Sequence, residues 1–125
     1  MALPAYKSYK FFNVTSPSEG VAHVEINRPE KLNAFSQPVW LEFGQVWKQV
    51  QFDEDVRVAI LSGAGDRAFT AGLDVQAAAS GGPFQGHEDA GVAKKAKVLR
   101  EHIEELQDCV TAMEKCEKRE YIPWV

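Results

Sequence analysis

The segment of this sequence best suited to take part in chemistry is Ala71-Gly72-Leu73-Asp74, which follows an apolar run ending at Ser62. A small residue and a glycine leave room for a ligand to approach the main chain, and a short helix beginning just after them would aim N–H groups at that ligand. An N–H group placed in this way polarises a carbonyl oxygen and forms half of an oxyanion hole. The local residues alone favour a structural turn, with the oxyanion hole as the alternative.

A second interpretation of the same region is a nucleotide site. Residues 63–68 match the pattern G-x-G-x-x-A after an apolar run, and acidic residues stand at 88–89, near the position that a dinucleotide fingerprint requires. In that motif a helix begins at the glycines and its N-terminus meets the pyrophosphate. Phe69 and Gly72 oppose a helix here, and no Gly-Lys-Ser/Thr follows, so nucleotide binding is disfavoured.

The spacing of apolar residues predicts the elements that position this segment. Residues 21–26 alternate apolar and polar, which predicts a half-buried strand, and the apolar run 56–62 predicts a strand covered on both faces. Between them, helical spacing predicts a helix from an N-cap at Ser36 to about Phe52. Strand, helix, strand, turn and helix in this order indicate the α/β class.

A long helix is predicted over residues 92–113. Apolar residues recur there at alternating steps of four and three, with charged residues outside the stripe. A helix docked on a sheet or a partner is the favoured interpretation, and a coiled coil is the alternative. Cys109 and Cys116, seven residues apart on this helix, would be separated by about 10 Å, too far for a disulfide, so both are expected to be packed thiols, as suits an intracellular chain.

Composition limits the partners. The 125 residues carry 14 Lys+Arg against 18 Asp+Glu, a net charge of -4, which argues against nucleic acid as the main partner. No run approaches the ~20 apolar residues of a membrane span, and neither a signal peptide, a transit peptide nor a peroxisomal C-terminus is recognised. No metal site is implied, because the histidines lack partners at ligand spacing.

Three segments carry a resemblance to a known family. Residues 27–34 (Asn-Arg-Pro-Glu-Lys-Leu-Asn-Ala), 58–63 (Val-Ala-Ile-Leu-Ser-Gly) and 69–74 (Phe-Thr-Ala-Gly-Leu-Asp) occur in this order. Together they resemble the enoyl-CoA hydratase/isomerase (crotonase) superfamily over residues 12 to 118. The bulky Leu73 resembles the Δ3,5-Δ2,4-dienoyl-CoA isomerase branch more than the hydratases, which usually carry alanine there. The resemblance implies the N-terminal half of a ββα-repeat spiral core, with residues 1–118 as the incomplete domain and residues 119–125 as a divergent tail.

The resemblance also implies a site. In this family two backbone N–H groups hold the thioester oxygen of an acyl-CoA substrate, and the first corresponds to the N–H of Leu73. Asp74 is expected to brace the turn rather than to catalyse, Arg28 to be a surface residue, and Phe84 with its glycine-rich loop to be a solvent spacer. Coenzyme A is part of the substrate, and no separate cofactor is implied. The segments expected to line it contain Lys31, Leu32, Asn33 and Ala34, and Ala71, Gly72, Asp74 and Val75.

Other parts of the family site have no counterpart here. Family members are longer, and their second N–H donor and catalytic carboxylates follow the long helix, whereas this sequence departs from the family pattern at Arg119. We therefore expect a member of a family that isomerises dienoyl-CoA or hydrates enoyl-CoA in fatty acid beta-oxidation, inactive in this truncated form. The alternative is a non-catalytic fragment that associates with full-length family subunits. Those subunits are trimeric or hexameric by family, and mitochondrial or peroxisomal.

Overall fold

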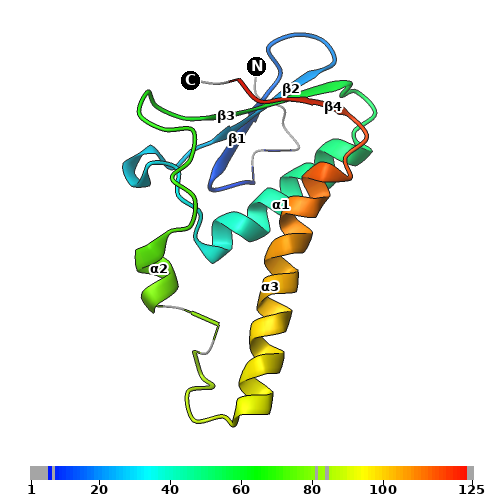
Figure 1. Cartoon of the computed structure of the whole chain (residues 1–125). Coiled ribbons are helices and arrows are strands. Elements are labelled where there is room, and N and C mark those ends of the chain that lie inside the picture. The colour runs from blue at the N-terminus through cyan, green and yellow to red at the C-terminus, as the bar shows by residue number, and fades with distance from the viewer. Residues whose placement is uncertain (1–5, 7, 81, 84, 124–125) are drawn as a thin grey trace.

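The computed structural model describes residue 6 and residues 8–80, 82–83 and 85–123, and four strands in this part form one sheet (Figure 1). The sheet order is β1-β2-β3-β4, with β1 antiparallel to β2 and the other neighbours parallel. The α/β prediction is confirmed. The elements in chain order are β1 (Phe12–Thr15), β2 (Val21–Ile26), the 3-10 turn η2 (Pro29–Lys31), α1 (Gln37–Phe52), β3 (Val58–Gly63), α2 (Val75–Ser80), α3 (Val92–Glu114) and β4 (Arg119–Tyr121).

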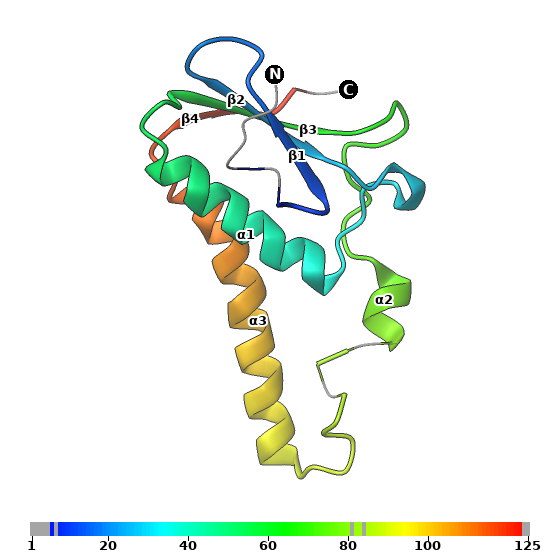
Figure 2. The ribbon, with the colours of Figure 1, turned by 180° about the vertical axis from the view of Figure 1, so that it is seen from behind.

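The core lies between one face of the sheet and α1, which runs beneath it (Figure 2). Alternation in β2 places Ala22, Val24 and Ile26 in this core with at most 1% of their surface exposed, as the period-two pattern predicts. Helix α1 contributes Val46 and Trp47, both fully buried. Ser36 stands at the N-cap of α1 as predicted, although its hydroxyl makes no capping hydrogen bond.

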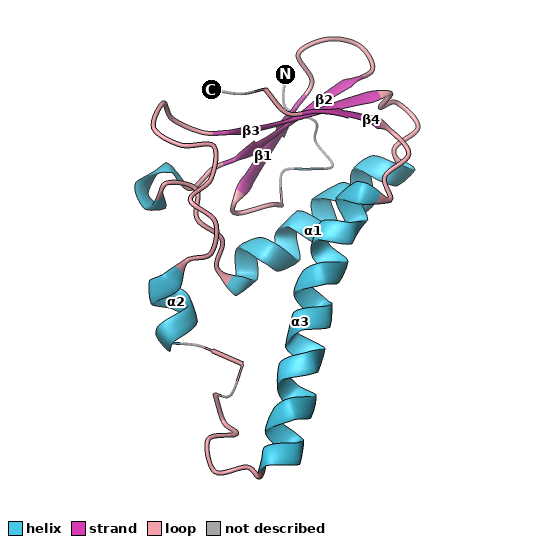
Figure 3. Cartoon of the chain, in the orientation of Figure 1, coloured by secondary structure: helices cyan, strands magenta, loops and turns pink. Residues whose placement is uncertain are grey.

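The predicted burial of the strand at 56–62 is correct for one face only. Ala59 and Leu61 of β3 are buried against the α1 side, whereas Val58 and Ile60 on the other face are half-buried. The helices of the described chain all lie on one side of the sheet (Figure 3), so no helix in this part of the chain covers the second face of β3.

The predicted helix at 92–113 is confirmed as α3, but only part of its apolar stripe packs: Leu106 and Met113 are half-buried, and Met113 contacts the core. Gly44 of α1 has no side chain, and a Cβ built there would lie 3.2 Å from Cα of Cys109, so the two helices approach one another closely at that point. Each helical residue is rotated about 100° from its neighbour. Docking through Cys109 therefore leaves Leu99, Ile103 and Val110 of the stripe 40–45% exposed.

The segment that sequence reasoning set aside as a divergent tail contains a strand. Arg119–Tyr121 forms β4, which pairs in parallel with β3 from Val58 to Ile60. Just before it, the Lys118 ammonium donates a hydrogen bond of 3.0 Å to the carbonyl of Asp53 beyond the end of α1. The end of α3 is thereby tied to the end of α1, and β4 extends the sheet by one edge strand.

Candidate oxyanion site

Two loops meet where the parallel strands β2 and β3 end. The loop after β2 and the segment after β3 run side by side, because the carboxyl ends of neighbouring parallel strands lie at one edge of the sheet. The Ala71 N–H donates to the Leu32 carbonyl at 3.0 Å, and the Phe35 N–H donates to the Gly72 carbonyl at 2.7 Å. The structure thus brings together the two segments that the sequence singled out.

The main chain at Leu73 has its polar groups turned outward. The N–H of Phe35 donates to the carbonyl of Gly72, and the carbonyl of Phe35 accepts from the N–H of Asp74 at 2.9 Å. These two hydrogen bonds make a parallel bridge between Phe35 and Leu73. Since successive peptide groups of an extended chain point to opposite sides, the N–H of Leu73 points away from Phe35. Within the described part of the chain no group accepts a hydrogen bond from it. An outward N–H of this kind is suited to be one donor of an oxyanion hole, and that role of Leu73 stays a prediction.

Gly72 leaves the approach to this N–H open. Its φ of +84° lies in the left-handed region that favours glycine, and a Cβ there would meet nothing within 4 Å. The neighbouring Ala71 and Val75 are exposed, and Leu73 itself is 53% exposed. A ligand oxygen can therefore reach the main chain without displacing a side chain.

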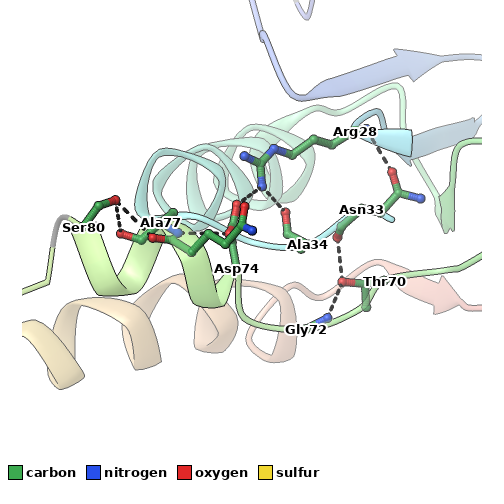
Figure 4. A network of polar contacts seen from close by, with 9 residues as sticks. Arg28, Asn33, Ala34, Thr70, Gly72, Asp74, Ala77 and Ser80 are labelled. Atoms are coloured by element: carbon green, nitrogen blue, oxygen red, sulfur yellow. Dashed lines mark hydrogen bonds and ion pairs between the residues drawn. The ribbon is translucent and has the colours of Figure 1, made fainter. Parts of the chain in front are cut away.

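Asn33 fixes the geometry from inside (Figure 4). It is fully buried in the left-handed conformation, with φ of +58°. Its amide nitrogen donates to the carbonyls of Ala64 and Ala68, and its side-chain oxygen accepts from the Arg28 N–H, each at 2.9 Å. Its own carbonyl accepts from the Thr70 hydroxyl at 2.7 Å. One side chain therefore joins the loop after β2 to the turn after β3.

Close packing around Asn33 explains the glycine at the end of β3. A Cβ on Gly63 would lie 2.3 Å from the carbonyl oxygen of Phe69 and 2.8 Å from the side-chain nitrogen of Asn33. The glycine is thus a requirement of this junction, rather than a sign of the phosphate-binding turn that its spacing also suggested.

Asp74 braces the turn, as expected. Its carboxylate accepts from the Ala77 N–H at 3.1 Å, which caps α2, and from the Arg28 guanidinium at 2.7 Å. The Ala77 N–H first, and the Arg28 guanidinium second, hold the pKa of Asp74 below its usual range. A carboxylate kept ionised in this way is poorly suited to proton transfer near neutral pH.

Arg28 corrects the expectation of a surface residue. Its side chain is only 15% exposed, and the same guanidinium nitrogen that binds Asp74 donates to the carbonyl of Ala34 at 2.9 Å. Because Arg28 and Asp74 are buried together, this ion pair holds the two segments in contact rather than reaching for a solvent anion. Arg28 and Asp74 are 46 positions apart in the sequence, and this separation conceals the pairing from sequence reasoning.

The remaining residues expected to line coenzyme A fall into two groups. Lys31, like Ala71, Gly72 and Val75, is exposed and can meet a ligand, and Leu32 is half-buried with φ of +54°. Ala34 is buried, as are Asn33 and Asp74, whose side chains are engaged with the protein. Contact of these residues with coenzyme A stays a prediction.

A small hollow of about 60 Å³ lies beside Leu73 and Asp74. Trp40 of α1 and His102 and Leu106 of α3 help to line it, together with Gly82 and Pro83 of the glycine-rich loop. Sequence reasoning missed Trp40 and His102, since nothing in their local spacing distinguishes them from packing residues. Phe84, which the sequence placed in the same loop as a solvent spacer, lies outside the described residues.

Other chemistry-bearing residues are accounted for by packing. His23 is half-buried with its Nε2 2.6 Å from the Ser62 hydroxyl, and Cys109 and Cys116 are separate buried thiols, as expected. In the described ranges no three His, Cys, Asp or Glu side chains gather as metal ligands. Over the same ranges no helix combines the length and the apolar character that a membrane crossing requires.

An outward main-chain N–H at the carboxyl edge of parallel strands is a group able to polarise a carbonyl oxygen. Comparison with known proteins identifies the family of the chain. The profile of the enoyl-CoA hydratase/isomerase family matches residues 16–115, and the chain belongs to that family, the crotonase superfamily.

Individual relatives are consistent with this assignment. The mitochondrial Delta(3,5)-Delta(2,4)-dienoyl-CoA isomerase of Mus musculus is 38% identical over 111 residues, 89% of this chain and 33% of its own length. The peroxisomal enzyme of that name from Arabidopsis thaliana is 34% identical over 94% of this chain and 41% of its own. An enoyl-CoA hydratase/isomerase structure from Xanthobacter autotrophicus Py2 superposes with a TM-score of 0.75 at 28% identity, over 92% of this chain and 38% of its own. The chain thus spans about a third of the length of the curated relatives it matches, and its fold corresponds to part of the crotonase fold.

Proposed function

We propose that this chain binds the thioester group of an enoyl- or dienoyl-CoA, with the N–H of Leu73 donating a hydrogen bond to the thioester oxygen. The observation that carries the proposal is the bridge between Phe35 and Leu73, which turns that N–H outward. The exposed main chain at Gly72 supports it, because a planar thioester can approach there. The names of the family and of the matched dienoyl-CoA isomerases support this substrate class.

The chemistry that such a donor supplies is stabilisation of negative charge. When a proton leaves the carbon alpha or gamma to a thioester, charge moves to the oxygen, and an N–H already aimed at that oxygen stabilises the enolate or dienolate. Removing one donor of this kind typically lowers the rate by about 10²–10³. Leu73 would therefore contribute through its main chain, and its side chain would face the acyl group.

Proton transfer needs a second group, and the carboxylate in the described lining of the hollow is not in a suitable state for it. Asp74 is the carboxylate in that lining, and its hydrogen bonds to Ala77 and Arg28 keep it ionised. We therefore expect the isolated chain to bind acyl-CoA without measurable turnover. In the cell, we expect it in mitochondria or peroxisomes, as the names of the matched relatives state for them.

The test is an amide NMR titration of the ¹⁵N-labelled chain. Acetyl-CoA should shift the Leu73 amide proton downfield, because the N–H gains a carbonyl acceptor. S-ethyl-CoA, a thioether that keeps the nucleotide but lacks the carbonyl oxygen, is the matched control and should leave that proton unshifted. Equal shifts with both ligands, or none with acetyl-CoA at saturation, would refute the assignment of Leu73.

Turnover is measured separately with a 3,5-dienoyl-CoA. We expect no isomerisation above a heat-inactivated sample. Isomerisation by the purified chain would show that a group other than Asp74, such as His102 of the same lining, transfers the proton, and would overturn the binding-only part of the proposal.

A further inference from the structure

The hollow beside Leu73 limits what can lie next to a thioester held at that residue. Its walls come from elements that are distant in the sequence: Trp40 from α1, Ala77 and Ala78 from α2, and Leu106 from α3. Leu73 is itself part of the lining, so the acyl chain of a thioester bound to its N–H starts at the edge of the hollow. The hollow is therefore a space into which that acyl chain can extend.

The wall on α1 is held in place by ring packing. Trp40 is half-buried, and its ring meets the ring of Phe35 edge-on, with the two centroids 4.8 Å apart. Phe35 is buried in the core, and its bridge with Leu73 turns the Leu73 N–H outward. Because Phe35 contacts both Trp40 and the main chain at Leu73, the distance from the hydrogen-bond donor to this wall is fixed by the core.

The wall on α3 is formed by one face of that helix. His102 and Leu106 are four residues apart, so they are neighbours on the helix surface, and both are half-buried. Ile103 is 43% exposed and is not part of the described lining. The hollow therefore ends at the face that bears His102 and Leu106, and the exposed side of α3 lies outside it.

The volume of the hollow sets the length of chain that it can cover. It measures about 60 Å³, and a water-sized group requires about 10–15 Å³ of such space, so about four to six groups of that size fit. Chain carbons are close to water in size. The hollow therefore holds about four to six carbons beyond the thioester carbon, which corresponds to a hexanoyl group. Carbons further along the chain stay in water and add no hydrophobic stabilisation.

We infer that this hollow seats the acyl chain and that Trp40 and Leu106 limit the part of the chain that it covers to about a hexanoyl group. The inference rests on the proposed function, since a thioester oxygen held at Leu73 is what places the chain. It narrows the substrate class to short-chain enoyl- or dienoyl-CoA. A 3,5-hexadienoyl group, the shortest 3,5-dienoyl group, is of this size.

Titration calorimetry of the whole chain with saturated acyl-CoAs, from acetyl-CoA to decanoyl-CoA, tests the limit. The dissociation constant should fall about fourfold for each added methylene group up to hexanoyl-CoA, from about 0.8 kcal/mol per buried methylene. Octanoyl-CoA and decanoyl-CoA should bind no more tightly than hexanoyl-CoA. A dissociation constant that keeps falling to decanoyl-CoA, or that is the same from acetyl-CoA to hexanoyl-CoA, would overturn the inference.

Two variants should move the limit in opposite directions. Leu106→Ala opens the wall on α3, because the surroundings of a large-to-small substitution relax only partially, so octanoyl-CoA should bind at least about fourfold more tightly than hexanoyl-CoA. Ala78→Leu narrows the hollow from an exposed position on α2, where a larger side chain does not disturb the core. In that variant hexanoyl-CoA should bind no more tightly than butanoyl-CoA.

Ile103→Ala is the matched control for Leu106→Ala. It also removes an apolar side chain from α3, but from outside the lining, and should leave the limit at hexanoyl-CoA. A limit that is unchanged in both Leu106→Ala and Ala78→Leu, or that moves in Ile103→Ala, would contradict the assignment of the walls.

The amide titration of Leu73 distinguishes failure of this inference from failure of the proposed function. If acetyl-CoA shifts the Leu73 amide proton but affinity does not depend on chain length, the thioester site stands and the hollow does not seat the acyl chain. If affinity levels off at hexanoyl-CoA but the Leu73 proton does not respond, the hollow binds acyl chains and the proposed hydrogen-bond donor is wrong.

Discussion

Replacing Asn33 with alanine tests whether one buried side chain holds the candidate site together. The substitution removes three hydrogen bonds of 2.9 Å, to the carbonyls of Ala64 and Ala68 and from the N–H of Arg28. A polar group left without its partner costs about 1–3 kcal/mol. Ala64, Ala68 and Arg28 are half-buried, so water can reach the freed groups and the lower end of that range applies.

The backbone conformation adds a second contribution. Asn33 has a φ of +58°, and an alanine in the left-handed region is less favourable by about 1 kcal/mol. Together these effects predict a loss of about 4 kcal/mol in the free energy of unfolding. That is a large share of the roughly 5–15 kcal/mol that stabilises a typical domain.

Urea unfolding followed by the fluorescence of the buried Trp47 measures this loss. Asn33→Gly is the matched control: it removes the same three hydrogen bonds but tolerates the positive φ, so it should be about 1 kcal/mol more stable than Asn33→Ala. In any folded fraction, the amide signals of residues 71–74 should move, because Asn33 joins the two segments. An unfolding free energy for Asn33→Ala within about 1 kcal/mol of the unchanged chain would refute this account of the junction.

Three further predictions follow from the described contacts. Gly72→Ala should lower the unfolding free energy by about 1 kcal/mol in urea, from its φ of +84° alone, since the new methyl group would meet nothing. Because the pKa of Asp74 is lowered by folding, its ionised form stabilises the chain fully above its unfolded pKa of about 4, and this contribution is lost as pH falls through the lowered value. The urea midpoint of Asp74→Asn should therefore not show this loss of stability below about pH 4. A variant whose midpoint falls at acid pH as much as that of the unchanged chain would contradict the assignment. Gly44→Ala should force α1 and α3 apart, costing about 1–3 kcal/mol and speeding alkylation of Cys109, whose burial raises its thiol pKa. Gly91→Ala, in open space at the N-cap of α3, should leave the alkylation rate of Cys109 unchanged.

Periodic burial is the part of this fold that the sequence reveals. The alternation at residues 21–26 and the helical spacing at residues 92–113 lie within single elements, so each can be recognised without knowledge of its neighbours. The order of the two loops around Asn33 and Leu73 was also recoverable, because their residues are distinctive in type and stand in continuous segments.

Contacts between distant elements could not be recovered in the same way. Arg28 lies 46 residues from Asp74, and its charge alone suggested a solvent-exposed side chain. Which line of α3 packs depends on the space left by Gly44, a residue of a different helix. Trp40 and His102 meet at the hollow only after α1 and α3 have docked. Each of these features is set by tertiary geometry and not by local periodicity.

The bridge between Phe35 and Leu73 separates two kinds of recognition at a single residue. The direction of the Leu73 N–H is set by hydrogen bonds that its neighbours make, and any residue except proline at this position keeps that donor. Its side chain, 53% exposed, makes none of those hydrogen bonds and is free to differ in size. On the proposed function, a lineage can change which acyl chains fit beside residue 73 by single substitutions while the N–H that would polarise the carbonyl stays in place. Selectivity for the acyl chain and stabilisation of charge are in this way open to independent evolutionary change.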